Sequence, residues 1–405
     1  MKRSPLAVLY AAVLVDMMGF GIVLPLLPFY LTDLGATPFQ VTIVIASFSA
    51  TQLAAAPIWG RVSDRRGRRP LLIAGLCASA LSYLIFGLAD SFWLLLLSRV
   101  TAGAAGGTIS IAHAYIADTT TAEDRARGMG HIGAASGLGV MLGPAIGGLF
   151  SDFGLGVPGF VAAGFCALNA VAAYFLLPES HSDAQRTAFQ TSQAATLRGW
   201  LTAMTRYPLS ILLAVYFLTI SSFTALTAVL ALYLDARFNM GPKELGLIFT
   251  LSGGSTVVIR GVLLGRLVSR FGETVTARIG IGSLLLALLA MPLLPSRAFA
   301  YIVPVIYAFG AGTLFPALAS MVSRASDPGA QGSILGGSQV VGGLGRVVGP
   351  MWAGWLFGST LGIRSPFLFG ASMVLAASFL SLRIPEMRRA PRVGTAAKAE
   401  PVAAD

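Results

Sequence analysis

Long apolar stretches separated by short polar ones run along the whole sequence. Twelve of them come close to the roughly 20 residues that a helix needs to cross about 30 Å of hydrocarbon. Residues 179–208 form a polar stretch long enough to be a linker, and it divides the twelve into six and six. Their approximate limits are 6–31, 39–60, 70–89, 91–114, 128–150, 157–177, 209–234, 243–265, 275–295, 299–321, 332–358 and 364–384.

This pattern predicts an all-α membrane protein with 12 transmembrane helices in two bundles of six. We expect an N-terminal bundle over residues 1–178, a linker over 179–207 and a C-terminal bundle over 208–385. The tail over 386–405 is polar and rich in alanine, a composition typical of disorder. Overall composition agrees, because 55% of the 405 residues are hydrophobic and only 11% are charged, against about 25% charged in a soluble domain.

The basic residues predict the topology. If the N-terminus lies inside, most of the 28 lysines and arginines fall in cytoplasmic segments or at the span ends beside them, as is usual for membrane proteins. The outer loops then hold Arg237, Lys243, Arg297 and Arg364. Both termini and the linker are therefore predicted to be cytoplasmic. The net charge of +11 reflects this orientation and contact with anionic lipid, so no nucleic-acid partner is needed to explain it.

Two motifs recur at nearly the same distance along the chain. GRVSDRRG over 60–67 has a counterpart in GRLVSRFG over 265–272, an offset of 265 − 60 = 205. GVMLGP over 139–144 has a counterpart in GRVVGP over 345–350, an offset of 345 − 139 = 206. Two unrelated motifs with nearly one offset indicate that the two bundles are duplicated halves.

Three motifs together resemble the signature of the major facilitator superfamily. They are G-x-x-x-D-R-x-G-R-R over 60–69, Arg99 within LLSRVTAGAAGG, and GLGVMLGPAIGG over 137–148. The last resembles a motif typical of the drug/proton antiporters in that superfamily. Among these, the chain is most similar to the tetracycline-resistance exporters, through residues 14–28, 63–70 and 114–148.

The resemblance implies the major facilitator fold and a proton-coupled exporter of small amphipathic compounds, such as drugs or antibiotics, that works by alternating access. Its implied partners are a small-molecule substrate, protons and the lipid bilayer. We expect a monomer in the cell membrane, in a bacterium the inner membrane, with no cofactor and no metal. The tetracycline exporters carry membrane acids where this chain has Ser82 and, approximately, Leu284, so tetracycline itself is in doubt as the substrate.

The charged segment GRVSDRRGRRP over 60–70 is expected to be a cytoplasmic loop between the second and third spans. As a plain charge run it would be solvated and would fix the orientation. The resemblance implies more, namely that Asp64 and Arg68 hold the cytoplasmic side shut when the cavity faces outward. The second copy has Ser269 in place of the aspartate. The expected gating loop comprises Gly60, Asp64, Arg65, Gly67, Arg68 and Arg69.

Small residues recur at every fourth position of the fifth span, which gives that helix one smooth face on which another helix backbone can approach closely. A static helix contact would explain such a ridge. The repeat in the eleventh span favours a hinge or a rocking interface between the halves, beside a proline that can bend the helix. The expected hinge motif comprises Gly139, Gly143, Pro144, Gly147, Gly349 and Pro350, and Ala135 extends the ridge.

Asp16 is the one acid deep in a predicted span, and intramembrane ionisable residues are usually functional. It lies 11 residues past Pro5, or about 16 Å along a helix, and Arg99 lies at a similar depth. We expect the two to pair and to form the proton-coupling site, in which burial favours the neutral carboxyl and Arg99 favours the charged one. The alternative is a static salt bridge between the first and fourth spans.

Polar and aromatic residues that the spans place near mid-membrane are candidates for the substrate cavity. Arg346 is expected either to attract an anionic group of the substrate or to be a partner for Asp16 in one state. Arg260 lies near the cytoplasmic end, where its side chain can reach the surface. The excess of arginine over acid points to a substrate with an anionic group. The candidate cavity residues are Phe20, Gln52, Asn169, Tyr216, Phe217, Phe223, Gln339 and Arg346.

Other classes of protein fit less well. The sequence contains no HExxH or GxSxG motif and no paired intramembrane carboxylates, so an enzyme is not expected. A channel would not require two halves with matched motifs. A proton-linked carrier of a metabolite or a sugar, including an importer, is the serious rival, because the direction of transport follows from the resemblance alone.

Overall fold

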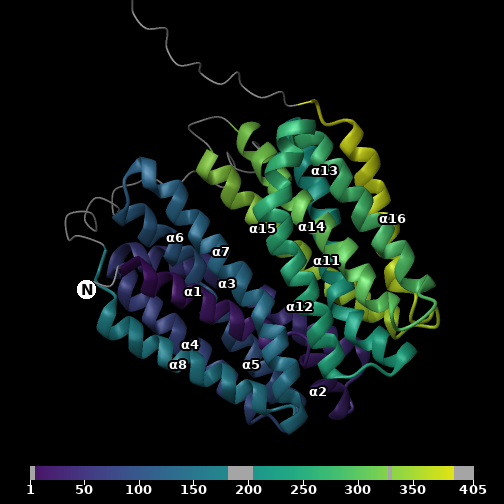
Figure 1. Cartoon of the computed structure of the whole chain (residues 1–405), viewed down its shortest axis with the longest axis horizontal. Helices are drawn as coiled ribbons and strands as arrows, with labels where there is room; N and C mark the ends of the chain where they lie inside the picture. The colour runs from purple at the N-terminus through teal and green to yellow at the C-terminus, as the bar shows by residue number, and fades with distance from the viewer. Residues whose placement is uncertain (1–4, 181–203, 327–330, 387–405) are drawn as a thin grey trace, which may run out of the picture.

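The computed structural model describes residues 5–180, 204–326 and 331–386 (Figure 1), and over these ranges the chain is helical with no strand. Residues 181–203 of the expected linker and 387–405 of the expected tail lie outside the described residues. The helices are α1 Pro5–Val23, α2 Leu27–Asp33, α3 Pro38–Arg66, α4 Arg68–Gly87, α5 Phe92–Ala105, α6 Thr108–Thr119, α7 Ala122–Phe150, η1 Ser151–Phe153, α8 Val157–Leu176, α11 Leu209–Phe238, α12 Pro242–Val258, η2 Ile259–Leu263, α13 Leu264–Ala290, η3 Met291–Leu293, α14 Phe299–Arg324, α15 Gln331–Phe357 and α16 Ser365–Leu382.

Local sequence signals set many of the helix limits. At the start of α3, Thr37 and Gln40 form a capping box, in which each side chain accepts a hydrogen bond from the other residue's backbone N–H, which satisfies donors that a helix start leaves free. Thr121 caps α7 by accepting from the N–H of Asp124. The chain leaves α11 through Asn239, whose φ of 51° is left-handed, a conformation that asparagine tolerates better than most residues.

Within the described residues, ten helical stretches are long and apolar enough to cross a membrane, so the chain is a multi-pass membrane protein. One of the ten runs over Pro242–Leu293 and contains the non-helical residue Gly272, while α15 is not among them. The stretch Phe92–Thr119 contains both α5 and α6, which are separated at Gly106 and Gly107. Those two glycines pack against Gln52 and Trp59 of α3, so the break lies where α3 crosses closely.

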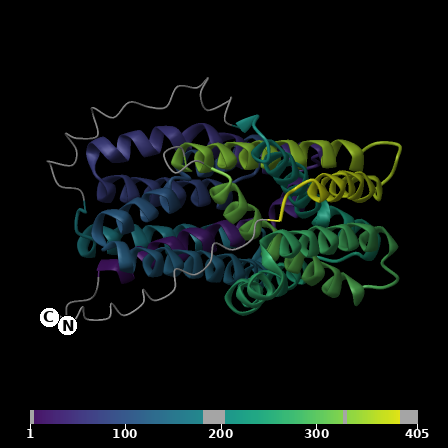
Figure 2. The ribbon, with the colours of Figure 1, turned by 90° about the horizontal axis from the view of Figure 1, so that it is seen from above.

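The described helices form two groups that lie side by side (Figures 1 and 2). Helices α1–α8 make one group, the N-half, and α11–α16 make the other, the C-half. Two helix pairs provide most of the contact between them: α7 packs against α12, and α3 packs against α15. By the offset of the repeat, α12 corresponds to α3 and α15 corresponds to α7, so the two contacts are equivalent to each other.

The repeated motif adopts the same backbone conformation in both halves. Gly67, between α3 and α4, has φ 98° and ψ 163°, and Gly272, within α13, has φ 80° and ψ 169°. The two positions are 272 − 67 = 205 residues apart, the offset that the sequence motif shows. A positive φ of this size is strained for any residue with a Cβ, which explains why a glycine stands at both positions.

The halves are in contact at one end of the molecule and separate toward the other. At the closed end, Gly354 packs on Thr42, Gly148 packs on Gly246, and Lys243 Nζ lies 2.7 Å from Asp152 Oδ2. Further along α15, Gly343 packs on Leu53 of α3, but two turns beyond it Gly336 faces open space. We call this second end the open end.

Candidate transport site

The charged segment over 60–70 is almost entirely helical, so the expectation of a loop was wrong. Helix α3 continues to Arg66 and α4 begins at Arg68, which leaves Gly67 as the whole connection. The positive φ of Gly67 turns the chain within one residue. A Cβ added to Gly60 would meet nothing within 4 Å, and Arg65 is exposed.

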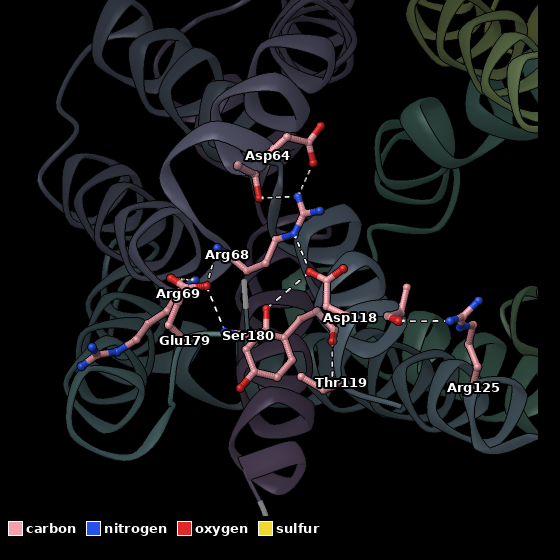
Figure 3. A network of polar contacts seen from close by, with 11 residues as sticks. Asp64, Arg68, Arg69, Asp118, Thr119, Arg125, Glu179 and Ser180 are labelled. Atoms are coloured by element: carbon pink, nitrogen blue, oxygen red, sulfur yellow. Dashed lines mark hydrogen bonds and ion pairs between the residues drawn. The ribbon is translucent and has the colours of Figure 1, made fainter. Parts of the chain in front are cut away.

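Arg68 joins three helices of the N-half (Figure 3). Its Nη1 atom lies 2.6 Å from Asp64 Oδ1 at the end of α3, and its Nε atom lies 3.0 Å from Asp118 Oδ2 on α6. Nη1 also donates to Ser63 Oγ at 3.0 Å. The Arg68 side chain is only 6% exposed, so the guanidinium is a buried cation held between two carboxylates.

Glu179, just beyond α8, caps the start of α4. Its carboxylate accepts from the backbone N–H of Arg68 at 2.9 Å and from that of Arg69 at 3.3 Å, as Figure 3 shows. A carboxylate at this place satisfies free donors and is favoured by the helix dipole. Arg69 itself donates to the Tyr174 carbonyl on α8. The sequence interpretation assigned no role to Glu179 or Asp118, because neither is near Arg68 along the chain.

The C-half carries a charge-reversed counterpart of this pair. Glu273 stands where Arg68 stands in the N-half (273 − 68 = 205), and Arg324 stands where Asp118 stands (324 − 118 = 206). Arg324 Nη2 lies 3.0 Å from Glu273 Oε1, which also accepts from Ser320 Oγ at 2.8 Å. Each half therefore has an ion pair at this place, between α4 and α6 in the N-half and between α13 and α14 in the C-half. The acid and the base are on opposite helices in the two halves.

The glycine ridge of α7 packs against α1 in the same half, so the expectation of an interface between the halves was wrong for this face. A Cβ on Gly139, Gly143 or Gly147 would lie 2.4–2.5 Å from a carbonyl oxygen of α1. In the C-half, a Cβ on Gly349 would likewise overlap the Ser221 carbonyl of α11. The pattern of small residues identified the smooth face correctly but gave no information on which helix it meets.

A neighbouring face of α7 makes the contact between the halves. Gly246 of α12 lies against the Pro144 carbonyl and Gly148, and Gly253 lies against Met141. Helix α7 therefore packs on α1 with one face and on α12 with another. It links the helix that carries Asp16 to the opposite half.

Asp16 and Arg99 do not form an ion pair in this conformation, contrary to expectation. Asp16 Oδ1 accepts from Ser79 Oγ of α4 at 2.9 Å. The Arg99 guanidinium donates to Ser98 Oγ and lies 5.7 Å from the ring centre of Tyr83 and 5.5 Å from that of Phe86. Both charged side chains are buried. Arg99 is satisfied by a hydroxyl and by two aromatic faces, which attract a cation.

A cavity lies between the halves and has two lobes. The polar lobe, of about 470 Å³, is lined by Asp16, Ser79 and His113 from the N-half and by Gln339 and Arg346 from α15. The apolar lobe, of about 490 Å³, is lined mainly by hydrophobic side chains of both halves. Residues that line both lobes are Met17, Phe20, Phe48, Ser49, Gln52, Ile109 and Arg346.

Most of the expected cavity residues line this space. Phe20, Gln52 and Arg346 line both lobes, Gln339 lines the polar lobe, and Phe223 lines the apolar lobe. Pro144 and Pro350 of the expected hinge motif also line the apolar lobe.

Three candidates, and Arg260, lie outside both lobes. Asn169 is buried and donates to the Ala12 carbonyl at 3.3 Å, so it joins α8 to α1. Tyr216 packs against Phe315 and Gly342, and the carbonyl of Phe217 faces Gly345. Arg260 lies in the π-helical turn η2 and is exposed. A position at mid-membrane does not reveal which side of its helix a residue occupies, and the three candidates lie on other sides. Arg260 was expected near the cytoplasmic end with its side chain toward the surface, and its exposure agrees with this.

A model of the Major Facilitator Superfamily matches residues 9–350. The chain belongs to the Major Facilitator Superfamily.

Relatives within the superfamily cover nearly the whole chain. The chain is 28% identical over 392 residues to the class C tetracycline resistance protein of Escherichia coli, a match that covers 96% of this chain and 97% of that protein. It is 29% identical over 385 residues to multidrug resistance protein 2 of Bacillus subtilis, covering 94% and 95%. The solved structure of the human organic anion transporter MFSD10 matches with a TM-score of 0.70 at 26% identity, covering 94% and 99%.

The sequence interpretation assigned no role to the histidine of the cavity. His113, on α6, lines the polar lobe together with Asp16. A signal was available, because His113 lies within the apolar stretch Phe92–Thr119, and ionisable residues inside the membrane are usually functional. Among the residues that the structure describes, no group of three histidines, cysteines or acids is placed to hold a metal ion.

Proposed function

We propose that the chain is a proton-coupled exporter of small amphipathic compounds that works as a monomer by alternating access. The observation that carries the proposal is the position of Asp16, the one acid among the described residues that line the cavity between the halves. An acid that is buried and within reach of the substrate can exchange a proton as the cavity changes its access. Asp16 is the proposed proton site, and Arg99 is proposed to pair with it in another conformation.

The proposed topology has twelve spans, six in each of the bundles over 1–178 and 208–385, with both termini in the cytoplasm. Splitting the stretch Pro242–Leu293 at Gly272 and adding α15 to the ten apolar stretches gives this number. In this topology the closed end lies on the outer side and the open end faces the cytoplasm. The conformation is then the one in which an exporter takes up its substrate.

The packing of α7 supports a connection between Asp16 and the movement of the halves. Asp16 lies on α1, whose next turns pack directly on Gly139 and Gly143 of α7. The other face of α7 packs on α12 of the C-half. When the halves move against each other, α7 must transmit part of that movement to α1, because backbone in contact at these distances cannot slide freely.

The Arg68 cluster is proposed to act as a cytoplasmic gate. In the present conformation Arg68 is held by Asp64 and Asp118 within the N-half, and the Asp64 side chain is 29% exposed. Closing the open end would bring the C-half to the exposed side of Asp64. The cluster thus holds Asp64 in position to contact the C-half in the outward-facing state.

The names of the related proteins agree with export of small compounds and differ in what they carry. They include tetracycline and multidrug resistance proteins, and a structure described as an organic anion transporter. Identities of 26–29% do not decide among such substrates.

Efflux from cells tests the proposal. Cells that express the wild type, Asp16→Asn or Asp33→Asn are loaded with a panel of antibiotics and dyes, and efflux is followed with and without a collapsed proton gradient. Asp33 is the matched control, since it is exposed at the end of α2. We expect gradient-dependent efflux by the wild type and Asp33→Asn, and none by Asp16→Asn at equal membrane levels. Gradient-dependent uptake instead would favour the importer, and normal efflux by Asp16→Asn would refute the role of Asp16.

A further inference from the structure

The cavity contains an arginine whose charge no described residue balances. Arg346, on α15, lines both lobes and forms no hydrogen bond or ion pair with any residue that the structure describes. The side chain is partly buried. A cation within the membrane is normally paired or placed in water, so an unpaired one on a cavity wall leaves a place for an anion.

Among the residues that the structure describes, the one acid on the cavity wall already has a hydrogen-bond partner. Asp16 accepts the hydrogen bond from Ser79 on the N-half wall, and it is not within ion-pair distance of Arg346. The other described ionisable groups that face the cavity are His113 and Tyr83 in the polar lobe and Arg99 and Tyr307 in the apolar lobe. None of these is an anion at neutral pH by its ordinary chemistry. The wall around Arg346 therefore carries excess positive charge.

The apolar lobe, which Arg346 also lines, has aromatic side chains against which a flat hydrophobic group can pack. The rings of Phe223 and Tyr307 stack at 4.7 Å with an angle of 2° between their planes, and both line the lobe with Phe20 and Phe249. A volume of about 490 Å³ is within the range of sites for drug-sized molecules. Arg346 is thus at the junction of a polar lobe and an aromatic one.

We propose that the substrates are amphipathic organic anions, whose carboxylate or sulfonate binds Arg346 while an aromatic body fills the apolar lobe. This inference rests on the proposed function, because it assigns the substrate class of the same cavity. A guanidinium can hold a carboxylate through two parallel hydrogen bonds, so it sets the orientation of the substrate as well as its charge. The anion binds across the cavity from Asp16, which leaves the proposed proton site free to exchange its proton.

Binding to the purified chain tests this assignment without any transport step. Calorimetric titrations at neutral pH compare 2-naphthoate with its neutral isostere 2-naphthamide and with the cation 2-naphthylmethylammonium. The proteins are the wild type, Arg346→Gln, Arg346→Lys and the control Arg260→Gln, which removes an exposed arginine outside both lobes. Circular dichroism and gel filtration establish that each variant is folded.

We expect the wild type and Arg260→Gln to bind naphthoate about tenfold more tightly than naphthamide, the factor that one partly buried ion pair provides. Arg346→Gln should bring the ratio close to one, and Arg346→Lys should keep part of it. Equal binding of the three probes by the wild type, no binding at all, or a ratio unchanged in Arg346→Gln would overturn the assignment. The proposed role of Asp16 in proton coupling is tested separately by the efflux of Asp16→Asn. A failure of that role does not alter these binding ratios.

Discussion

Gly143→Ala tests whether the contact between α7 and α1 is as close as the structure requires. The added Cβ would lie 2.5 Å from the Met18 carbonyl oxygen and 2.7 Å from the Gly21 Cα atom. Nonbonded atoms are comfortable at about 3.5 Å, so the two helices would have to separate by about 1 Å. Both obstacles are backbone atoms, and a change of rotamer cannot relieve them.

The magnitude follows from two opposing effects. Overfilling a packed interface destabilises a protein by about 1–3 kcal/mol. Replacing glycine by alanine inside a helix stabilises the helix by up to about 1 kcal/mol. We expect Gly143→Ala to lower the free energy of unfolding by about 1–2 kcal/mol, taking the upper part of the first range. Asp16 lies on the same helix as Met18, so transport should fall as well.

Thermal unfolding in detergent and efflux from cells measure the two effects, and α7 provides its own control. Gly133→Ala is the same substitution on the same helix, at a position where the new Cβ meets nothing within 4 Å. It should unfold at or above the wild-type temperature and transport normally. The reasoning is refuted if Gly143→Ala is as stable and as active as Gly133→Ala.

Two further predictions concern the ends of the molecule. Arg68→Gln removes the cation shared by Asp64 and Asp118. It should lower the free energy of unfolding by about 2 kcal/mol, because the two carboxylates lose this cation and are themselves only partly exposed. Arg65→Gln, at an exposed position, should change it by less than about 0.5 kcal/mol; equal unfolding temperatures for the two would contradict the cluster. At the closed end, cysteines that replace Asp152 and Lys243 in a background without native cysteines should react with a short cross-linker and stop efflux. Continued efflux after complete cross-linking would show that this end does not open.

Local features of the fold are readable from the sequence because they depend on neighbouring residues. Apolar stretches of membrane length predicted the positions of the helices. The offset between the repeated motifs predicted duplicated halves, and the structure adds that Gly67 and Gly272 share a backbone conformation. The helical course of 60–70 was missed, since a charged, glycine-containing segment usually forms a loop. Here one glycine makes the whole turn, and Glu179 caps the next helix from 111 residues away.

The partners of side chains were less predictable, because they depend on how helices are rotated and paired. Similar depths suggested that Asp16 pairs with Arg99, but Ser79 and two aromatic rings hold the two charges apart. The glycine ridge revealed a close contact without naming α1 as the partner. Arg346, a candidate for the cavity, does line it, but its depth alone could not show which side of α15 it occupies.

Proton movement in everted membrane vesicles tests the central role of Asp16 most directly. Vesicles are acidified inside by respiration, a pH-sensitive fluorophore reports the gradient, and compounds that the wild type exports from cells are added in turn. We predict that each compound makes protons leave wild-type and Asp33→Asn vesicles, and that none does so with Asp16→Asn. Equal proton release from Asp16→Asn vesicles would contradict the account, because the coupling carboxylate would then lie elsewhere.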